Sequence, residues 1–263
     1  MHAKFNLDPQ SETWQNHYYS GSIIHRANKA IVETDLEKFK NIDGTLQAKE
    51  IIENWFPLIK ADVFLSHSHK DEELIIGLAG WLNDNFGIKS FIDSTVWGYS
   101  DELLKAIDNK YCKNESGETY SYEQRNRSTS HVHMMLSTAL ADMIDQCECV
   151  IFVNTQNSFK PADYFKQEGQ TESPWIYSEI AMTRMIRERS PEEHRPQLGL
   201  ESISASTKRL NEARERELRI SYETDLLHLT PLSLTDLKTW KIKEGQKMQK
   251  TLALDSLYEM KRM

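Results

Sequence analysis

Three short runs with strand character follow one another in the middle of the chain, separated by stretches with helical periodicity. The runs are residues 61–65 (ADVFL), 89–93 (KSFID) and 147–154 (CECVIFVN). Between the first two, apolar positions recur at helical spacing over residues 74–82, and Gly87 ends that pattern. Strands that alternate with helices in this way are typical of βαβ units, so the pattern predicts an α/β fold with a parallel sheet.

Helical patterns continue on both sides of these runs. They lie within residues 1–59, around Leu103–Ile107, at 131–146, at 175–189 and toward the C-terminus at 248–260. Residues 94–99 are expected to be a loop, as are residues 155–174. The charged stretch at 201–217 is expected to be helical, with further extended pieces at 218–223 and 226–234.

These patterns divide the chain into three parts. Residues 1–59 are interpreted as a helical N-terminal extension, residues 60–240 as an α/β domain, and residues 241–263 as a C-terminal helix. Within the α/β domain, the polar residues near 109–130 are interpreted as an insertion or mobile loop.

Composition and charge narrow the classes of function. The 263 residues carry 40 acids and 32 Lys or Arg, for a net charge of −8, with no concentrated basic face for a nucleic-acid backbone. No run of about 18 apolar residues predicts a membrane span, and no apolar core of a signal peptide is visible. Three cysteines without a spaced framework indicate free thiols. We therefore expect a cytoplasmic protein with no nucleic-acid or membrane partner.

Candidate site residues follow the predicted strands. In an open parallel sheet, ligands bind outside the carboxyl ends of the strands. Ser66 and His67 follow the first run, while Asp93 and Trp97 fall at the end of the second run and in the loop after it. The helix from Trp175 begins downstream of the third run, so its first turn is expected to face the same crevice.

Trp175 and Glu179 lie four residues apart, and therefore one turn apart on the same face of that helix. An aromatic ring can stack on a cationic heterocycle, and a carboxylate can stabilise an oxocarbenium-like centre when a sugar bond breaks. Nicotinamide joined to ribose offers both a cationic ring and a breakable N-glycosidic bond. The same spacing also occurs by chance in helices with a core tryptophan and a solvated glutamate.

Four segments in order resemble the Toll/interleukin receptor (TIR) domain family: ADVFLSHSHKDEE, FIDSTVWGYSDELLKAID, CVIFVNT and PWIYSE. The resemblance covers roughly residues 60 to 190, with a weaker continuation to about 240. It implies a flavodoxin-like open parallel sheet of about five strands with helices on both faces. Enzymatic members cleave NAD+ with a glutamate in a W-x-x-x-E stretch, which Trp175 to Glu179 match. The chain looks closest to bacterial stand-alone TIR-like proteins of anti-phage defence, such as Thoeris.

The resemblance implies an NAD+ glycohydrolase that releases nicotinamide and produces a linear or cyclic ADP-ribose signal in antiviral defence. Glu179 would be catalytic, and the substrate-binding residues would be Ser66, His67, Asp93, Trp97 and Trp175. NAD+ would be a substrate and not a cofactor, since no glycine-rich phosphate loop follows any strand. The expected partners are a second copy of the chain and a separate effector that senses the product. The alternative is a non-catalytic TIR-type interaction module.

Two histidine pairs could suggest a metal. His67 and His69, and likewise His131 and His133, are two residues apart. Zinc needs three or four ligands, and residues two apart on a helix do not share a face. No further ligand is evident, so no metal site is predicted.

Overall fold

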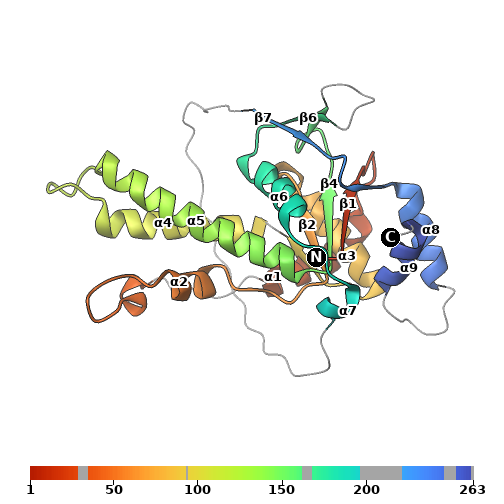
Figure 1. The fold of residues 1–263 in the computed structure, drawn as a ribbon, viewed down its shortest axis with the longest axis horizontal. Helices are drawn as coiled ribbons and strands as arrows, with labels where there is room; N and C mark the ends of the chain where they lie inside the picture. The colour runs from red at the N-terminus through yellow and green to blue at the C-terminus, as the bar shows by residue number, and fades with distance from the viewer. Residues whose placement is uncertain (29–34, 93, 162–167, 196–220, 246–252, 262–263) are drawn as a thin grey trace.

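A parallel sheet forms the centre of the protein (Figure 1). The computed structural model describes residues 1–28, 35–92, 94–161, 168–195, 221–245 and 253–261. The sheet has the order β3-β2-β4-β1-β8, and every neighbouring pair is parallel. Its strands are β1 (Ala3–Leu7), β2 (Val63–Ser66), β3 (Ser90–Ile92), β4 (Cys149–Val153) and β8 (Thr230–Leu232). The predicted α/β open parallel sheet of about five strands is confirmed.

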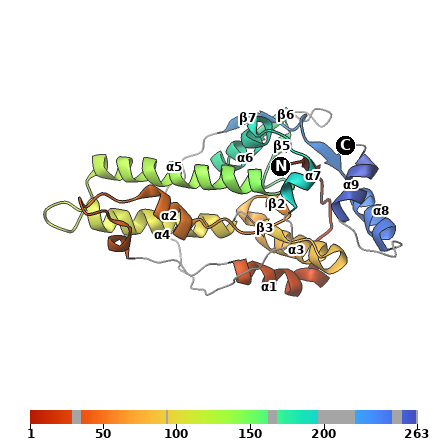
Figure 2. The ribbon, with the colours of Figure 1, turned by 60° about the horizontal axis from the view of Figure 1, so that its bottom comes forward.

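Helices pack on both faces of this sheet (Figures 1 and 2). One apolar cluster joins the sheet to α1 (Tyr18–Asn28), α3 (Glu72–Phe86), α8 (Leu234–Gly245) and α9 (Ala253–Lys261). Two others join it to α2 (Ala48–Trp55), α4 (Ser94–Tyr111), α5 (Tyr122–Gln146) and α6 (Pro174–Met185). The alternation along β2 separates the faces, because Val63 and Leu65 enter the first cluster and Phe64 enters the second. Among the described residues, no helix is long and apolar enough to cross a membrane.

Two glycines allow α1 and α3 to pack closely. A Cβ atom at Gly21 would lie 1.8 Å from the carbonyl oxygen of Ile76, and one at Gly80 would lie 2.0 Å from that of His17. Any side chain at either position would force the helices apart. The close packing of α1 therefore depends on glycine at both positions.

The first 59 residues contribute more than the predicted helical extension. They do form α1, the 3-10 helix η2 (Leu36–Phe39) and α2, but Ala3–Leu7 is β1, which lies in the sheet between β4 and β8. The prediction is therefore wrong for this segment. Its sequence, AKFNL, alternates buried apolar residues with the half-buried Lys4 and Asn6, and so lacks the continuous apolar run of a strand covered on both faces.

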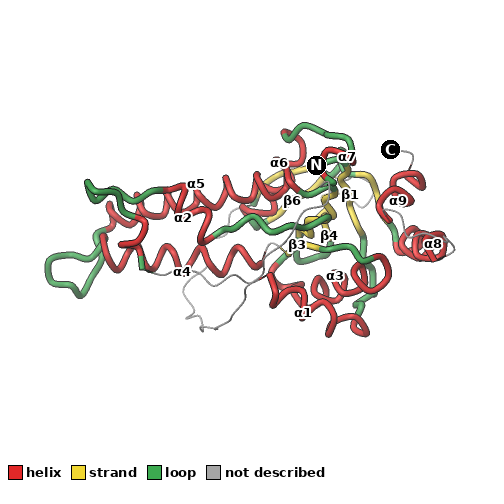
Figure 3. Tube along the Cα trace, turned by 90° about the horizontal axis from the view of Figure 1, so that it is seen from below, coloured by secondary structure: helices red, strands yellow, loops and turns green. Residues whose placement is uncertain are grey.

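The α4–α5 hairpin projects away from the sheet (Figures 2 and 3). Instead of a long loop near 109–130, only residues 112–121 connect the two helices, and the expected loop at 94–99 is the helical start of α4. Ser121 caps α5 by accepting a hydrogen bond from the backbone N–H of Gln124. The loop prediction near 109–130 failed because the start of α5 exposes polar residues on most of its surface and so lacks the apolar periodicity of a packed helix.

A second, smaller sheet lies in the C-terminal half. It is antiparallel and consists of β5 (Lys160–Pro161), β6 (Glu168–Thr171) and β7 (Tyr222–Asp225), partly within a segment expected to be a loop. The extended piece expected at 226–234 contains β8. The helix expected at 201–217 lies outside the described residues. Where one C-terminal helix was predicted, α8 and α9 are both present.

The three cysteines are free and buried. Cys147 lies just before β4, Cys149 is its first residue, and Cys112 follows α4. Burial raises the pKa of all three thiols, so they remain protonated at neutral pH and contribute to packing.

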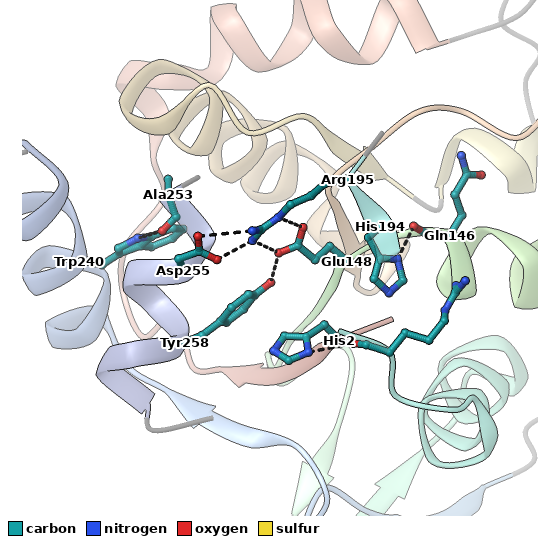
Figure 4. A network of polar contacts seen from close by, with 10 residues as sticks. His2, Gln146, Glu148, His194, Arg195, Trp240, Ala253, Asp255 and Tyr258 are labelled. Atoms are coloured by element: carbon teal, nitrogen blue, oxygen red, sulfur yellow. Dashed lines mark hydrogen bonds and ion pairs between the residues drawn. The ribbon is translucent and has the colours of Figure 1, made fainter. Parts of the chain in front are cut away.

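A network of charged residues closes the amino end of the sheet (Figure 4). Arg195, directly after α7 (Pro191–His194), donates to both carboxylate oxygens of Glu148 over 2.8 and 2.9 Å and also to Asp255 on α9. Tyr258 on α9 donates to Glu148 over 3.0 Å. Burial, aided by nearby Cys149 and Glu148, raises the pKa of Tyr258, so its hydroxyl keeps the proton that it donates. The network attaches α9 to the sheet.

Replacing Arg195 tests this network. Arg195→Met leaves the buried Glu148 without its guanidinium, and removing one partner of such a pair destabilises proteins strongly. We expect the free energy of unfolding to fall by on the order of 3 kcal/mol in urea titrations, and α9 to become more sensitive to protease. The control is Arg187→Met, at an exposed arginine. Equal stability of the two variants would contradict the assignment.

Candidate functional site

The candidate site lies where the order of the sheet reverses. From β2 the chain continues to β3 on one side, and later returns to β4 on the other side of β2. In open α/β sheets such a switch point leaves a crevice beyond the carboxyl ends of the two strands, where ligands bind. Ser66 is the last residue of β2 and pairs in register with Phe152 of β4. The predicted residues Ser66 and His67 therefore lie at this switch point.

The hydrogen bond between Ser66 and Glu179 is the centre of the site. Ser66 Oγ donates to Oε2 of Glu179 over 2.6 Å. Only 2% of Ser66 and 1% of Glu179 is exposed. Moving a carboxylate out of water is unfavourable unless hydrogen bonds replace those of the solvent, and glutamates are rarely fully buried. A glutamate buried at a switch point is therefore a candidate for chemistry.

Local sequence and packing fix the helix that carries Glu179. Ser173 caps α6 by accepting from the backbone N–H of Ile176, and Pro174 occupies the first turn, where its missing N–H is not needed. Ile176 and Ile180 belong to the same buried cluster as Phe152 of β4. These residues fix the rotation of α6 about its axis. Glu179, on the neighbouring face of the helix, therefore points toward the end of β2.

Trp175 lies one turn before Glu179, as predicted, but its ring is half-buried. It packs against the apolar cluster of α5 and meets His133 edge to face, with 5.3 Å between the ring centroids and 85° between their planes. Sequence reasoning considered His133 only as a metal ligand and missed this contact. The spacing of His133 from His131 suggested a metal ligand, and nothing in the sequence predicts that His133, on α5, contacts Trp175 of α6.

The loops beyond β2 and β4 are joined by Asp71. Thr155 Oγ1 donates to one of its carboxylate oxygens over 2.5 Å, and Asn157 Nδ2 donates to the other over 2.7 Å. Ser158 Oγ in turn donates to the carbonyl of Val153 at the end of β4. These bonds hold the two walls of the switch point at a fixed separation.

The structure describes the remaining predicted site residues to different extents. His67 is buried directly after β2, and its Nδ1 lies 3.2 Å from the carbonyl oxygen of Leu65. Asp93 lies outside the described residues. At Trp97 only the helical backbone of α4 is described. The structure therefore joins Ser66 to Glu179, places Trp175 one turn away, and does not describe the side chains of Asp93 and Trp97.

A cluster that sequence reasoning missed lies one turn beyond Glu179. Thr183 Oγ1 lies 2.9 Å from Nε2 of His228, and Arg184 Nε donates to Nδ1 of His228 over 3.2 Å. Burial, with the charge of Arg184, lowers the pKa of His228 to about 4, so the ring is neutral at neutral pH. The neutral ring attaches α6 to the segment before β8. The sequence separation of 45 between Thr183 and His228 hides this contact from any local pattern.

The described residues contain no group of three or more His, Cys, Asp or Glu side chains that could hold a metal ion. Comparison with known proteins finds no matching family model, no matching curated protein and no matching solved structure. The chemistry of the site is therefore argued from its geometry.

That geometry suits the stabilisation of positive charge. A carboxylate in a water-poor environment interacts with a nearby cation far more strongly than it would in water. The hydroxyl of Ser66 orients one oxygen of Glu179. A sugar with a developing charge at its anomeric carbon is one partner for such a group, because it presents both a cation and hydroxyl donors.

A double-mutant cycle tests the Ser66–Glu179 bond independently of any activity. A hydrogen bond to a charged acceptor is stronger than one to a neutral acceptor, so Ser66→Ala should destabilise the wild type more than it destabilises Glu179→Gln. We expect a coupling free energy of about 1 kcal/mol from urea unfolding of the four proteins. Ser66→Ala combined with Glu259→Gln, an exposed glutamate on α9, should be additive. Additive effects at Ser66 and Glu179 would show that the bond is absent in solution.

Proposed function

We propose that this chain is an NAD+ glycohydrolase of the TIR-like type, with Glu179 as its catalytic residue. The observation that carries the proposal is the buried Glu179, held by Ser66 at the switch point of a parallel sheet. Trp175 lies one turn before Glu179 on α6, at the spacing of the W-x-x-x-E stretch. The order of the four TIR-like segments along the chain supports the same assignment.

In the proposed reaction, the bond between the ribose anomeric carbon and the nicotinamide nitrogen breaks. The bonding electron pair goes to the nitrogen, so nicotinamide leaves as a neutral molecule and positive charge develops on the ribose. Glu179 stabilises that charge and accepts a hydrogen bond from the ribose. Water then attacks the anomeric carbon and loses a proton to give ADP-ribose, whereas attack by an adenine nitrogen gives a cyclic product.

Access to Glu179 requires a change of conformation. With 1% of the residue exposed, NAD+ cannot reach the carboxylate unless neighbouring side chains move. The described state is therefore a resting state in this proposal, and self-association supplies the opening. Trp97, at the start of α4, is the proposed anchor between subunits, because large aromatic residues often anchor interfaces. The product would be read by a separate effector in a cytoplasmic antiviral pathway.

The second candidate is a non-catalytic TIR-type interaction module. The burial of Glu179 favours it as well, because a carboxylate that accepts a hydrogen bond inside a domain also serves structure alone. The two candidates differ in one measurable property, the release of nicotinamide from NAD+.

Neutralising Glu179 tests the proposed chemistry. Glu179→Gln keeps the shape of the side chain and removes its charge, so nicotinamide release should fall by about 10² to 10³. Nicotinamide is quantified by chromatography, with circular dichroism to check the fold and Glu259→Gln as the charge-matched control. Wild-type turnover by a folded Glu179→Gln protein would exclude Glu179 as the catalytic residue. Absence of release by the wild type at every concentration tested would favour the interaction module.

Opening by self-association predicts a rate that rises faster than linearly with protein concentration. Trp97→Ala should flatten this dependence while leaving the thermal unfolding transition unchanged. Initial rates of nicotinamide release are measured from nanomolar to tens of micromolar enzyme, beside the apparent mass from sedimentation velocity. A strictly linear rate over that range would identify a self-sufficient monomer.

A further inference from the structure

A cavity lies between α2 and the α4–α5 hairpin. Its volume is about 590 Å³, within the range of small-molecule sites. The hairpin and α2 lie side by side in Figure 2, and the segment before α2 also contributes to the lining of the cavity. Neither Ser66 nor Glu179 lines it. The cavity is therefore separate from the site proposed above.

The interior of the cavity is mostly apolar. Ile51 comes from α2, Ile107 from α4, and Met134 and Met135 from α5. Met135 and Ile51 belong to the buried core, whereas Met134 is 67% exposed. Flexible methionine side chains adapt to ligands of varied shape. These surfaces fit an apolar tail.

Among the described residues, two basic side chains and no acidic ones line the cavity. Arg127 and His131 lie one turn apart on α5, so both face the cavity from the same side. Its lining, which falls entirely within the described residues, includes no Asp or Glu, although the chain carries 40 acids against 32 Lys and Arg. A cavity with basic groups alone in an acidic protein is complementary to an anion.

The ion pair that Arg127 forms leaves it able to bind such an anion. Its Nη2 donates to Glu123 over 2.7 Å, but both side chains are about three-quarters exposed. Exposed pairs of this kind contribute little stability, so an incoming carboxylate can replace Glu123.

The polar side chains at the floor of the cavity are already hydrogen-bonded to other residues of the protein. Cys112 Sγ donates to Ser128 Oγ over 3.7 Å, and Ser128 Oγ donates to Asp108 over 2.5 Å. Arg125 pairs with the other oxygen of Asp108 over 2.9 Å. The charge of Asp108 is therefore neutralised behind the floor and does not repel an anion at the mouth.

We propose that this cavity binds an alkyl carboxylate. The apolar chain lies between Ile51, Ile107 and Met135, and the carboxylate is held by Arg127 with His131 as a second donor. A simple fatty acid of eight to ten carbons has this chemistry, with a single anionic head and an unbranched apolar tail.

Calorimetric titration of the full chain with hexanoate, octanoate and decanoate tests the proposal. Each methylene buried should tighten binding about fourfold at a single site. Decanol, which has the same tail and no charge, should bind about tenfold more weakly than decanoate. An affinity that does not depend on chain length would exclude the apolar cavity, and equal affinity for decanol would exclude the anionic head.

Paired variants locate the site. Arg127→Gln should weaken decanoate binding about tenfold, whereas Lys113→Gln, on the same hairpin but outside the lining, should leave it within about twofold. Ala48→Trp should fill the mouth and abolish binding, while Lys49→Trp, its exposed neighbour, should not. Thermal unfolding shows that each variant is folded. Equal effects within either pair would overturn the proposal. The proposal would also be overturned if the protein binds no decanoate and instead forms a dimer that Ala48→Trp disrupts.

Discussion

The pairing of β1 between β4 and β8 is the constraint on which the rest of the structure depends. Without it, β4 would be an edge strand and β8 would have no neighbour in the sheet. The same segment also holds α6, because Lys4 Nζ donates to the carbonyl of Thr183 over 3.2 Å and pairs with Glu188 over 2.8 Å. The backbone N–H of Arg189 donates to the carbonyl of Met1. The position of Glu179 on α6 therefore depends on β1, which precedes it by more than 170 residues in the sequence.

Two buried glutamates at opposite ends of the sheet illustrate two uses of the same residue type. Glu148, at the amino end, receives two hydrogen bonds from Arg195 and one from Tyr258, so its charge is matched by a cation within the protein. Such a group stabilises one arrangement and is not available for chemistry. Glu179, at the carboxyl end, is held by a serine hydroxyl, a donor of the same kind as the hydroxyl of a sugar. In the proposed reaction, the ribose of NAD+ would offer Glu179 a similar hydrogen bond.

The parts of the fold that could be predicted from the sequence are those in which local pattern and tertiary position agree. Residues 61–65 and 147–154 are mostly apolar, and they include most of β2 and all of β4 in the middle of the sheet. In β1, the half-buried Lys4 and Asn6 break that pattern, and Lys4 contacts α6 through Thr183, which lies far away in the chain. Ser66 and Glu179 could be assigned to the same end of the sheet. Their direct bond depends on the rotation of α6, which Ile176 and Ile180 set through Phe152. His133 and His228 reach the site from distant segments, so no spacing rule identifies them.

The position of β1 also determines the order in which the molecule can be assembled. Its residues leave the ribosome well before those of β4 and β8, yet Ala3 pairs with Cys149 and Phe5 with Thr230, so both neighbouring strands are synthesised much later. Contacts between such distant residues give a high contact order and slow folding. During synthesis the apolar side chains of Ala3, Phe5 and Leu7 have no partner strand, and unpaired segments of this kind are bound by chaperones or aggregate. The strand that completes the sheet is thus also a segment exposed to misfolding while the protein is being made.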